Sequence, residues 1–288
     1  MAVVHDGLPV PADGPLRVLL VHAHPDDETL TTGATMARYA AEGAQVVLVT
    51  CTRGERGEVI GPLGHLEGDG DALGAHREGE LAAAMAALGV TDHRFLGADA
   101  GVRFRDSGMA WGEHGRAVAA PDTGDDAFAR VPVEEAAAHL RRVVDEVRPH
   151  VVVTYDAEGG YGHPDHVRAH EVAVAALADR QDPLLLAVAS PRTPHEAGVA
   201  RLRGRGLRTL EAPWPSVVVP DDAVTHRVDA QAHRPAKAAA LRAHATQVVV
   251  ADDEEAYALS NGVWHELTGT EWFTTLRPGS TTPAGGPA

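Results

Sequence analysis

Two short segments of this chain combine histidines and carboxylates at spacings that could hold a metal ion. Residues 22–28 read His-Ala-His-Pro-Asp-Asp-Glu, and residues 159–166 read Gly-Gly-Tyr-Gly-His-Pro-Asp-His. Imidazoles and carboxylates are the usual protein ligands of divalent transition metals, and a catalytic site needs about three of them plus an open position for water. The first segment can supply His24 and either Asp26 or Asp27, and the second can supply a histidine.

Asp26 and Asp27 are adjacent in the chain, and adjacent side chains in an extended or turn segment usually point in different directions. One carboxylate can therefore bind the metal while the other faces the water. A carboxylate beside a water that a metal activates is what a general base requires. The same chemistry needs no serine or cysteine nucleophile, and the sequence has no Gly-x-Ser-x-Gly, Walker A or His-Glu-x-x-His motif.

Each His-Pro-Asp could instead be a structural turn, because Asp caps helices and Pro favours the first helical position. Here the tripeptide occurs twice, each time after a predicted strand and before a predicted helix, so we favour the metal site. A non-catalytic module that binds a nucleotide or a sugar is a weaker hypothesis, because the glycine fingerprint for nucleotides is absent. A structural metal site is also a weaker hypothesis, because such a site would be closed, without a spare carboxylate.

The apolar run at residues 17–22 predicts a buried strand, residues 28–42 predict a helix that stops at Gly43, and residues 45–51 predict a second strand. A strand, a helix and a strand in this length form a βαβ unit, which implies parallel strands. We expect further helices over 75–88, 133–147, 164–178 and 235–245, and strands over 93–96, 150–154, 183–189, 216–219 and 224–228. Residues 53–72, 98–130 and 190–215 are predicted loops.

These elements predict an α/β fold with a Rossmann-like, mostly parallel sheet and helices on both faces. Ligands bind beyond the carboxyl ends of the strands in such sheets. Because both metal-binding segments follow a strand, we expect the active site at that edge. Residues 1–15 are expected to be a flexible leader, 16–277 a single domain, and 278–288 a disordered tail.

Composition limits the class of partner. The chain has 288 residues with a formal net charge of −16, a surface that repels nucleic acid and anionic lipid. We therefore expect a small-molecule partner, with no nucleic acid and no membrane. No apolar run approaches a bilayer span and residues 1–15 lack a secretion signal, which predicts a cytoplasmic location. The single cysteine, Cys51, excludes an intrachain disulfide, and nothing indicates the oligomeric state.

The two segments, in this order, resemble the N-acetylglucosaminyl-phosphatidylinositol de-N-acetylase family, also called the LmbE-like family. Its hallmarks are His-Pro-Asp-Asp-Glu near the first strand and a later His-Pro-Asp-His, and both are unbroken here. The resemblance covers residues 17–178 and continues more weakly through 237–250. It implies a hydrolase that removes an N-acetyl group with one Zn²⁺ per chain, or with Fe²⁺, which also suits imidazole and carboxylate ligands.

Within this family, the chain is similar to the deacetylases that act on N-acetylglucosaminyl-inositol in the mycothiol biosynthesis of actinobacteria. The supporting segments are residues 50–60, 105–109, 154–166 and 243–248. The alternatives are the mycothiol S-conjugate amidases, which typically have Pro where this chain has Gly162, and a de-N-acetylase for another N-acetylglucosaminyl substrate. Gly162 and Met109 favour the deacetylase, whereas residues 183–222 depart from the family's pattern and leave the pocket rim open.

The resemblance implies roles for individual residues. Three residues would bind the metal: His24, Asp27 and His166. Asp26 would be the general base that activates the water. His163 would act near the scissile amide, either as a general acid or as a stabiliser of the tetrahedral oxyanion.

Five further residues would surround this centre. Asp165 would orient the neighbouring histidine with its carboxylate, and Tyr161 would donate a hydrogen bond to the oxyanion. Arg77, Asp106 and Met109 would contact the sugar or the inositol.

Overall fold

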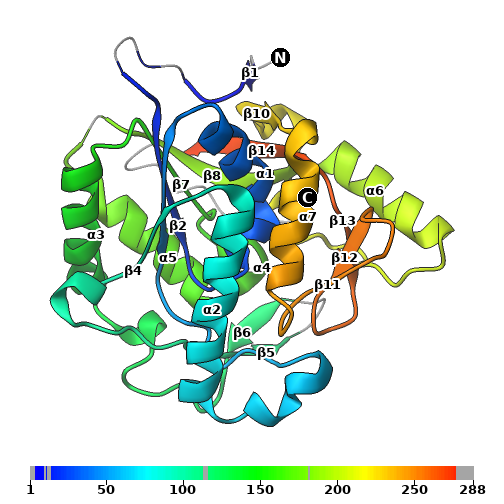
Figure 1. Cartoon of the computed structure of the whole chain (residues 1–288), viewed down its shortest axis with the longest axis horizontal. Helices are drawn as coiled ribbons and strands as arrows, with labels where there is room; N and C mark the ends of the chain where they lie inside the picture. Colours follow the sequence, from blue (N-terminus) through cyan, green and yellow to red (C-terminus); the bar gives the residue numbers. More distant parts are fainter. Residues whose placement is uncertain (1–3, 10, 12–13, 113–115, 181, 277–288) are drawn as a thin grey trace.

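A twisted sheet of nine strands runs through the molecule in the computed structural model, which describes residues 4–9, 11, 14–112, 116–180 and 182–276 (Figure 1). The strand order is β1-β10-β14-β8-β7-β2-β3-β4, and β9 pairs with β8. Strands β8, β7, β2, β3 and β4 are parallel neighbours, and β14 is antiparallel to both β8 and β10. The strands are β1 (His5–Asp6), β2 (Arg17–His22), β3 (Gln45–Thr50), β4 (Asp92–Phe95), β7 (Val151–Thr154), β8 (Leu184–Pro191), β9 (Val218–Val219), β10 (His226–Asp229) and β14 (Thr270–Leu276).

Helices cover both faces of this sheet, so its central strands are apolar on both sides. Helices α1, α2 and α7 pack together on one face, and α3 and α5 pack together on the other (Figure 1). The helices are α1 (Asp27–Ala41), α2 (Gly70–Leu88), α3 (Val133–Val147), α4 (Gly159–Gly162), α5 (Pro164–Ala176), α6 (Arg192–Gly204) and α7 (Arg234–Ala243). Leu20, Leu48 and Val152 are fully buried between the two layers.

The direction of chain travel changes between β2 and β7. From β2 the chain moves outward through β3 to β4, whereas β7 lies on the other side of β2 and leads to β8. In open sheets of this type a crevice forms at such a switch point, beyond the carboxyl ends of the strands. The two segments singled out in the sequence follow these two strands, which are hydrogen-bonded neighbours.

The predicted α/β fold with a mostly parallel sheet and helices on both faces is confirmed. The loop predicted over residues 190–215 is wrong, because α6 occupies its first half. Pro194 lies in the first turn of α6, where a missing backbone N–H costs no intrahelical hydrogen bond, so this proline does not break the helix. Strand β14 was not assigned from the sequence, and it extends the parallel part of the sheet by an antiparallel strand.

Smaller elements decorate the predicted loops. Strands β5 (Met109–Trp111) and β6 (Ala117–Ala119) form a hairpin within residues 98–130. Strands β11 (Val249–Val250), β12 (Ala256–Ala258) and β13 (Trp264–Glu266) form a small separate sheet. In the predicted leader, β1 pairs with β10, whereas the predicted tail at 278–288 lies outside the described residues.

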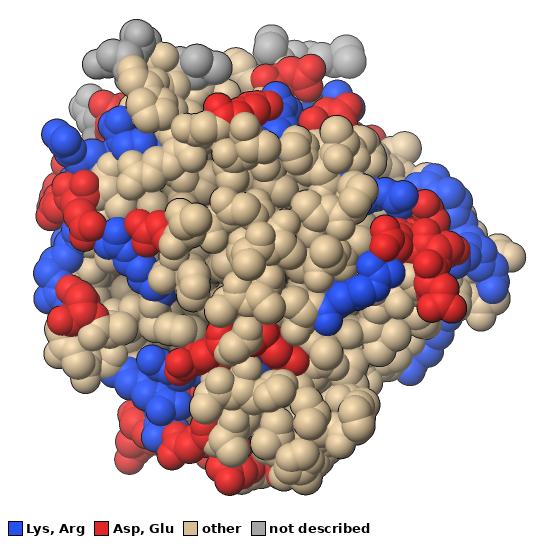
Figure 2. All heavy atoms as spheres, viewed as in Figure 1, with Lys and Arg blue, Asp and Glu red and all other residues tan. Residues whose placement is uncertain are grey.

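Charged side chains of both signs lie mainly around the rim of the face shown in Figure 2, and neutral side chains fill its middle. That face therefore offers no continuous basic patch to a polyanion. Among the described helices, none combines the length and the apolar character that a membrane crossing would require.

A buried ion pair ties together three elements behind the first candidate segment. Lys237 of α7 and Glu271 of β14 lie 2.8 Å apart (Nζ to Oε1), and each side chain is 3% exposed. The Glu271 carboxylate also accepts hydrogen bonds from the backbone N–H groups of Ala34 and Thr35 in α1. This carboxylate therefore holds α1, α7 and β14 in one arrangement.

We expect Lys237→Met to lower the free energy of unfolding by about 3–5 kcal/mol, because it leaves the Glu271 carboxylate buried without its cation. Urea unfolding followed by circular dichroism measures the change. The control is Arg201→Met, which breaks an ion pair with Glu266 at the surface and should cost at most about 1 kcal/mol. Equal, small effects of the two substitutions would show that the buried pair does not hold the elements together.

Candidate active site

A cavity of about 140 Å³ lies beyond the carboxyl ends of β2 and β7. Most residues that the sequence predicted for the site line it: His24, Asp26, Asp27, Arg77, Asp106, Met109, Tyr161 and His163. The two remaining candidates, Asp165 and His166, are buried beside these residues. The structure thus brings together residues that are far apart in the chain.

Asp27 joins the two predicted segments. It is the first residue of α1, where a carboxylate is favoured by the helix dipole. Its Oδ2 atom accepts the backbone N–H of His24 and lies 3.2 Å from both His24 Nδ1 and His166 Nε2. Burial alone would raise the pKa of Asp27, but the rings of His166 and His24 hold this pKa well below its usual range.

His166 presents one ring nitrogen to the cluster and uses the other for support. Its Nδ1 atom lies 3.2 Å from the Gly159 carbonyl oxygen, and its ring stacks on Tyr155. A carbonyl only accepts hydrogen bonds, so Nδ1 carries the proton and Nε2 keeps its lone pair in the neutral ring. Within the described chain, this buried Nε2 has no hydrogen-bond partner.

These contacts fit a divalent metal. Ring nitrogens of His24, His163 and His166 lie within 4.8 Å of one another, and the Asp27 carboxylate lies between two of these rings. Nε2 of His166 makes no hydrogen bond within the described chain, and in the neutral ring its lone pair is available to a metal. His163 lies as close to the cluster as the three predicted ligands, so the choice of ligands remains a prediction.

Asp165 does not use its carboxylate to orient His163, as the sequence had suggested. The carboxylate accepts hydrogen bonds from the N–H and hydroxyl groups of Ser107, and its Oδ2 atom lies 3.2 Å from His24 Nε2. It is instead the backbone N–H of Asp165 that donates to Nδ1 of His163. The reason is local: His163 caps the N-terminus of α5, where free N–H groups are available.

The cap determines the proton position on His163. Because Nδ1 accepts a hydrogen bond, the neutral ring carries its proton on Nε2. Burial, together with the rings of His24 and His166, holds the pKa of His163 well below its usual range. For His24, burial also lowers the pKa, but the carboxylates of Asp106, Asp165 and Asp27 more than offset this and raise it.

Asp26 has an unusual backbone conformation, with φ at 108° and ψ at −39°. Its side chain is 13% exposed and lies 3.4 Å from the guanidinium of Arg77. Burial raises the pKa of Asp26 to about 7, whereas the charge of Arg77 acts in the opposite direction. The carboxylate can therefore gain and lose a proton near neutral pH, as a general base must.

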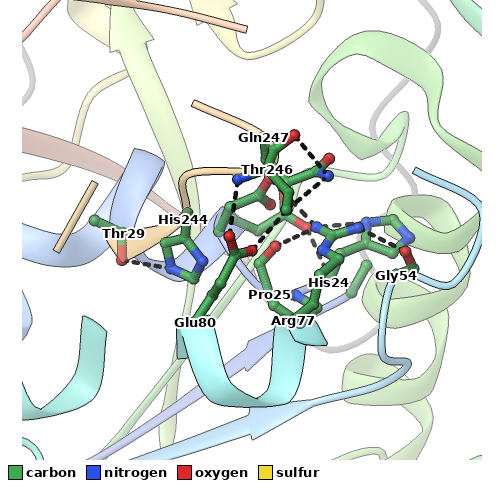
Figure 3. Close-up of polar contacts among 12 residues, drawn as sticks. His24, Pro25, Thr29, Gly54, Arg77, Glu80, His244, Thr246 and Gln247 are labelled. Carbon is green, nitrogen blue, oxygen red and sulfur yellow. Dashed lines mark hydrogen bonds and ion pairs between the residues drawn. The ribbon is translucent and has the colours of Figure 1, made fainter. Parts of the chain in front are cut away.

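Arg77 binds the protein's own loops (Figure 3). Only 2% of the residue is exposed, and its guanidinium donates hydrogen bonds to the carbonyl oxygens of Pro25 and Gly54. A Cβ atom at Gly54 would lie 1.9 Å from Arg77 Nη1, so the close approach requires glycine. Arg77 lines the cavity, and its predicted contact with the sugar remains a prediction.

Asp106 and Met109 form another part of the wall. The Asp106 carboxylate accepts the backbone N–H groups of Arg56 and Gly108, which fixes its loop. Met109 begins the β5–β6 hairpin, and this hairpin packs against Gly162. The φ of Gly162 is 97°, and a Cβ atom there would lie 2.8 Å from the Ala117 carbonyl oxygen, so neither proline nor alanine fits this arrangement.

The segment after α7 has structural roles that its sequence did not predict, although residues 243–248 supported the resemblance. Gln247 lines the cavity and donates a hydrogen bond to the Glu58 carbonyl oxygen. Thr246 donates its N–H and hydroxyl groups to the Glu80 carboxylate of α2 (Figure 3). His244 contacts Glu28. The cluster of polar residues in this short segment was the sequence feature that could have indicated a place in the site.

Comparison with known proteins gives consistent matches. The profile of the family described as PIG-L, GlcNAc-PI de-N-acetylase, matches residues 19–177. A 1D-myo-inositol 2-acetamido-2-deoxy-alpha-D-glucopyranoside deacetylase from Kineococcus radiotolerans is 54% identical over 271 residues, covering 87% of this chain and 74% of that protein. A protein of the same name from Thermobispora bispora is 50% identical over 292 residues, covering 94% of this chain and 92% of that protein.

Among solved structures, the zinc-inhibited form of the teicoplanin deacetylase Orf2 superposes with a TM-score of 0.55. The match covers 92% of this chain and 100% of the other, at 23% sequence identity. At this identity the comparison establishes a shared fold.

We expect His166→Ala to weaken zinc binding by more than about 100-fold, because it removes a nitrogen that faces the cluster. Loss of a residue that only hydrogen-bonds to a metal ligand typically weakens binding by roughly 10–100-fold. Zinc titration against a competing chelator measures the affinity. The control is His170→Ala, one turn further along α5, whose ring contacts the Tyr155 carbonyl oxygen. A His166→Ala protein that binds zinc like the control would remove His166 from the ligand set.

Proposed function

This chain belongs to the GlcNAc-PI de-N-acetylase family, and we propose that it hydrolyses the N-acetyl amide of 1D-myo-inositol 2-acetamido-2-deoxy-alpha-D-glucopyranoside. The products would be glucosaminyl-inositol and acetate, a step of mycothiol biosynthesis in the cytoplasm. The observation that carries the proposal is one cavity in which Asp26 lies beside the cluster of His24, Asp27 and His166. The names of the similar proteins support the choice of substrate.

We propose that His24, Asp27 and His166 hold one divalent ion per chain. Zinc is the first candidate, and two imidazoles with one carboxylate also suit Fe(II). When bound, the ion supplies Lewis-acid chemistry that polarises the amide carbonyl and makes water more acidic.

Asp26 is proposed to move the proton. Its carboxylate takes a proton from the water whose oxygen attacks the amide carbon. It then returns this proton to the nitrogen as the C–N bond breaks, which releases acetate and the amine. A group with a pKa of about 7 suits both transfers, because it neither holds nor loses the proton too strongly near neutral pH.

His163 suits the role of oxyanion stabiliser. Its neutral ring carries a proton on Nε2, and this N–H group can donate to the oxygen that gains negative charge. Tyr161 borders the same cavity, and burial raises the pKa of its hydroxyl, which keeps it a hydrogen-bond donor. A neutral sugar would then be oriented by polar groups of the wall, among them Asp106 and Gln247.

The mycothiol S-conjugate amidase activity is the second candidate, and one observation favours it. A neighbouring cavity of about 230 Å³ shares Leu30 with the active-site cavity, and apolar side chains that include Trp264 and Trp272 line much of it. Such a space could take the larger acyl part of a conjugate. Gly162 favours the deacetylase instead, because its φ of 97° is closed to the proline that is typical of the amidases.

The test is the release of free amine, detected with fluorescamine, from N-acetylglucosaminyl-inositol and from a bimane conjugate of mycothiol. We expect zinc-loaded protein to prefer the first substrate, and we expect Asp26→Asn to lose about 10²–10⁴-fold in rate. The control is Asp99→Asn, a carboxylate exposed on the surface. Preference for the conjugate would assign the amidase activity, and no release from either substrate would exclude both.

Arg77 gives a pH-dependent prediction. Its positive charge lowers the pKa of Asp26, so Arg77→Gln should raise that pKa. The base acts when deprotonated, and the acid limb of kcat/KM should therefore move to higher pH in this variant. Arg77→Lys keeps the charge and should keep the limb near its wild-type position. An acid limb that is unchanged in Arg77→Gln would show that Asp26 is not the group that titrates there.

A further inference from the structure

Asp26 is held in a conformation that side chains other than glycine rarely adopt. Its φ of 108° and ψ of −39° lie outside the ordinary regions, and such a residue typically costs about 1–3 kcal/mol unless its surroundings enforce it. The residue lies between the last residues of the β2 segment and the first turn of α1. Something in the surrounding structure must therefore keep its backbone in place.

Glu28 makes the contact that does so. Its Oε2 atom accepts the backbone N–H of Asp26 at 2.9 Å, and the Thr29 hydroxyl donates to Oε1. The Glu28 side chain is completely buried. This carboxylate is thus directed at the amide of the residue proposed as the base, and its own charge needs a partner.

His244 is that partner, from a segment 216 residues away in the chain. Its Nε2 atom lies 2.8 Å from Glu28 Oε1, and its side chain is also completely buried. Since Glu28 accepts, Nε2 carries the proton that it donates. The other ring nitrogen, Nδ1, has no hydrogen-bond partner among the described residues, so the contact with Glu28 is the principal polar anchor of the ring.

The segment that carries His244 is itself fixed. Its backbone N–H donates to the Leu241 carbonyl at the end of α7, and Thr246 is bound through two hydrogen bonds to Glu80 of α2 (Figure 3). A continuous chain of contacts therefore runs from α2 and α7 through His244 and Glu28 to the backbone of Asp26. Neither His244 nor Glu28 is among the described residues that line the cavity, so neither touches a substrate there.

We propose that His244 and Glu28 form a positioning pair that holds the Asp26 backbone at its positive φ and so directs the Asp26 carboxylate at the reaction. This inference rests on the proposed function of Asp26 as the base. The pair differs from an ordinary structural contact because its loss should reduce kcat while the substrate and the metal still bind.

The test compares His244→Leu with His244→Gln in the zinc-loaded, full-length protein. Loss of the donor in His244→Leu should reduce kcat by about 100-fold, the effect of a misplacement near 1 Å, with KM and zinc content unchanged. The side-chain amide of His244→Gln can still donate to Glu28 and should restore most of kcat. Glu28→Gln, which keeps the size of the side chain but places an NH₂ group against at least one of its three donors, should lower kcat as well.

His226→Leu is the matched control, because it removes another buried histidine, in β10, that stacks on His5. It should lower the melting temperature without changing kcat. If the wild type is active and kcat is unchanged in both His244→Leu and Glu28→Gln, the positioning role is wrong but the proposed function stands. If the wild type is inactive on both substrates, the proposed function is wrong. A crystal structure of His244→Leu that retains the φ of Asp26 overturns the pair in either case.

Discussion

Buried negative charge is the constraint on which the site depends. Asp27, Glu28, Asp106 and Asp165 are all buried at one edge of the sheet. A buried carboxylate is tolerated only when cations or N–H donors compensate it. Imidazoles of three segments and the guanidinium of Arg77 supply part of that compensation, and a divalent ion among them would supply more. Metal affinity and the folding of this edge are therefore linked, since both respond to the same excess of carboxylates.

The sheet topology explains why only two short segments need to carry most of the chemistry. The strands that precede them are parallel neighbours at the point where chain travel reverses, so their carboxyl ends open on the same crevice. The rest of the cavity wall comes from loops whose carboxylate side chains accept backbone N–H groups of neighbouring loops. Glu55 accepts the backbone N–H of Asp106, and Asp106 accepts that of Arg56, so two distant loops fix each other.

The sequence predicted the fold class, the strands of the parallel sheet and the residues of the two motifs, because each depends on local pattern. Arg77, Asp106 and Met109 were expected from the resemblance to the family. Hydrophobic runs mark buried strands, and two motifs follow them. It did not predict α6, β14 or the contacts of Asp165. These depend on tertiary partners. Strand β14 lies between β8 and β10. Nδ1 of His163, which the Asp165 carboxylate was expected to orient, instead caps α5 by accepting the Asp165 backbone N–H. His244 was missed because its partner is 216 residues away.

The pair Asp26 and Asp27 shows what backbone conformation adds to a motif. Sequence leaves open which carboxylate would face a metal, because both lie within three residues of His24 along the chain. In the folded chain, Asp27 is helical and its side chain turns back onto the two histidine rings, whereas Asp26 has a positive φ and its side chain turns toward Arg77. The proposed division of labour would thus follow from a change of backbone conformation between neighbouring residues. Glu28 accepts the Asp26 N–H group, so the third acidic residue of the motif contributes to holding the first in this conformation.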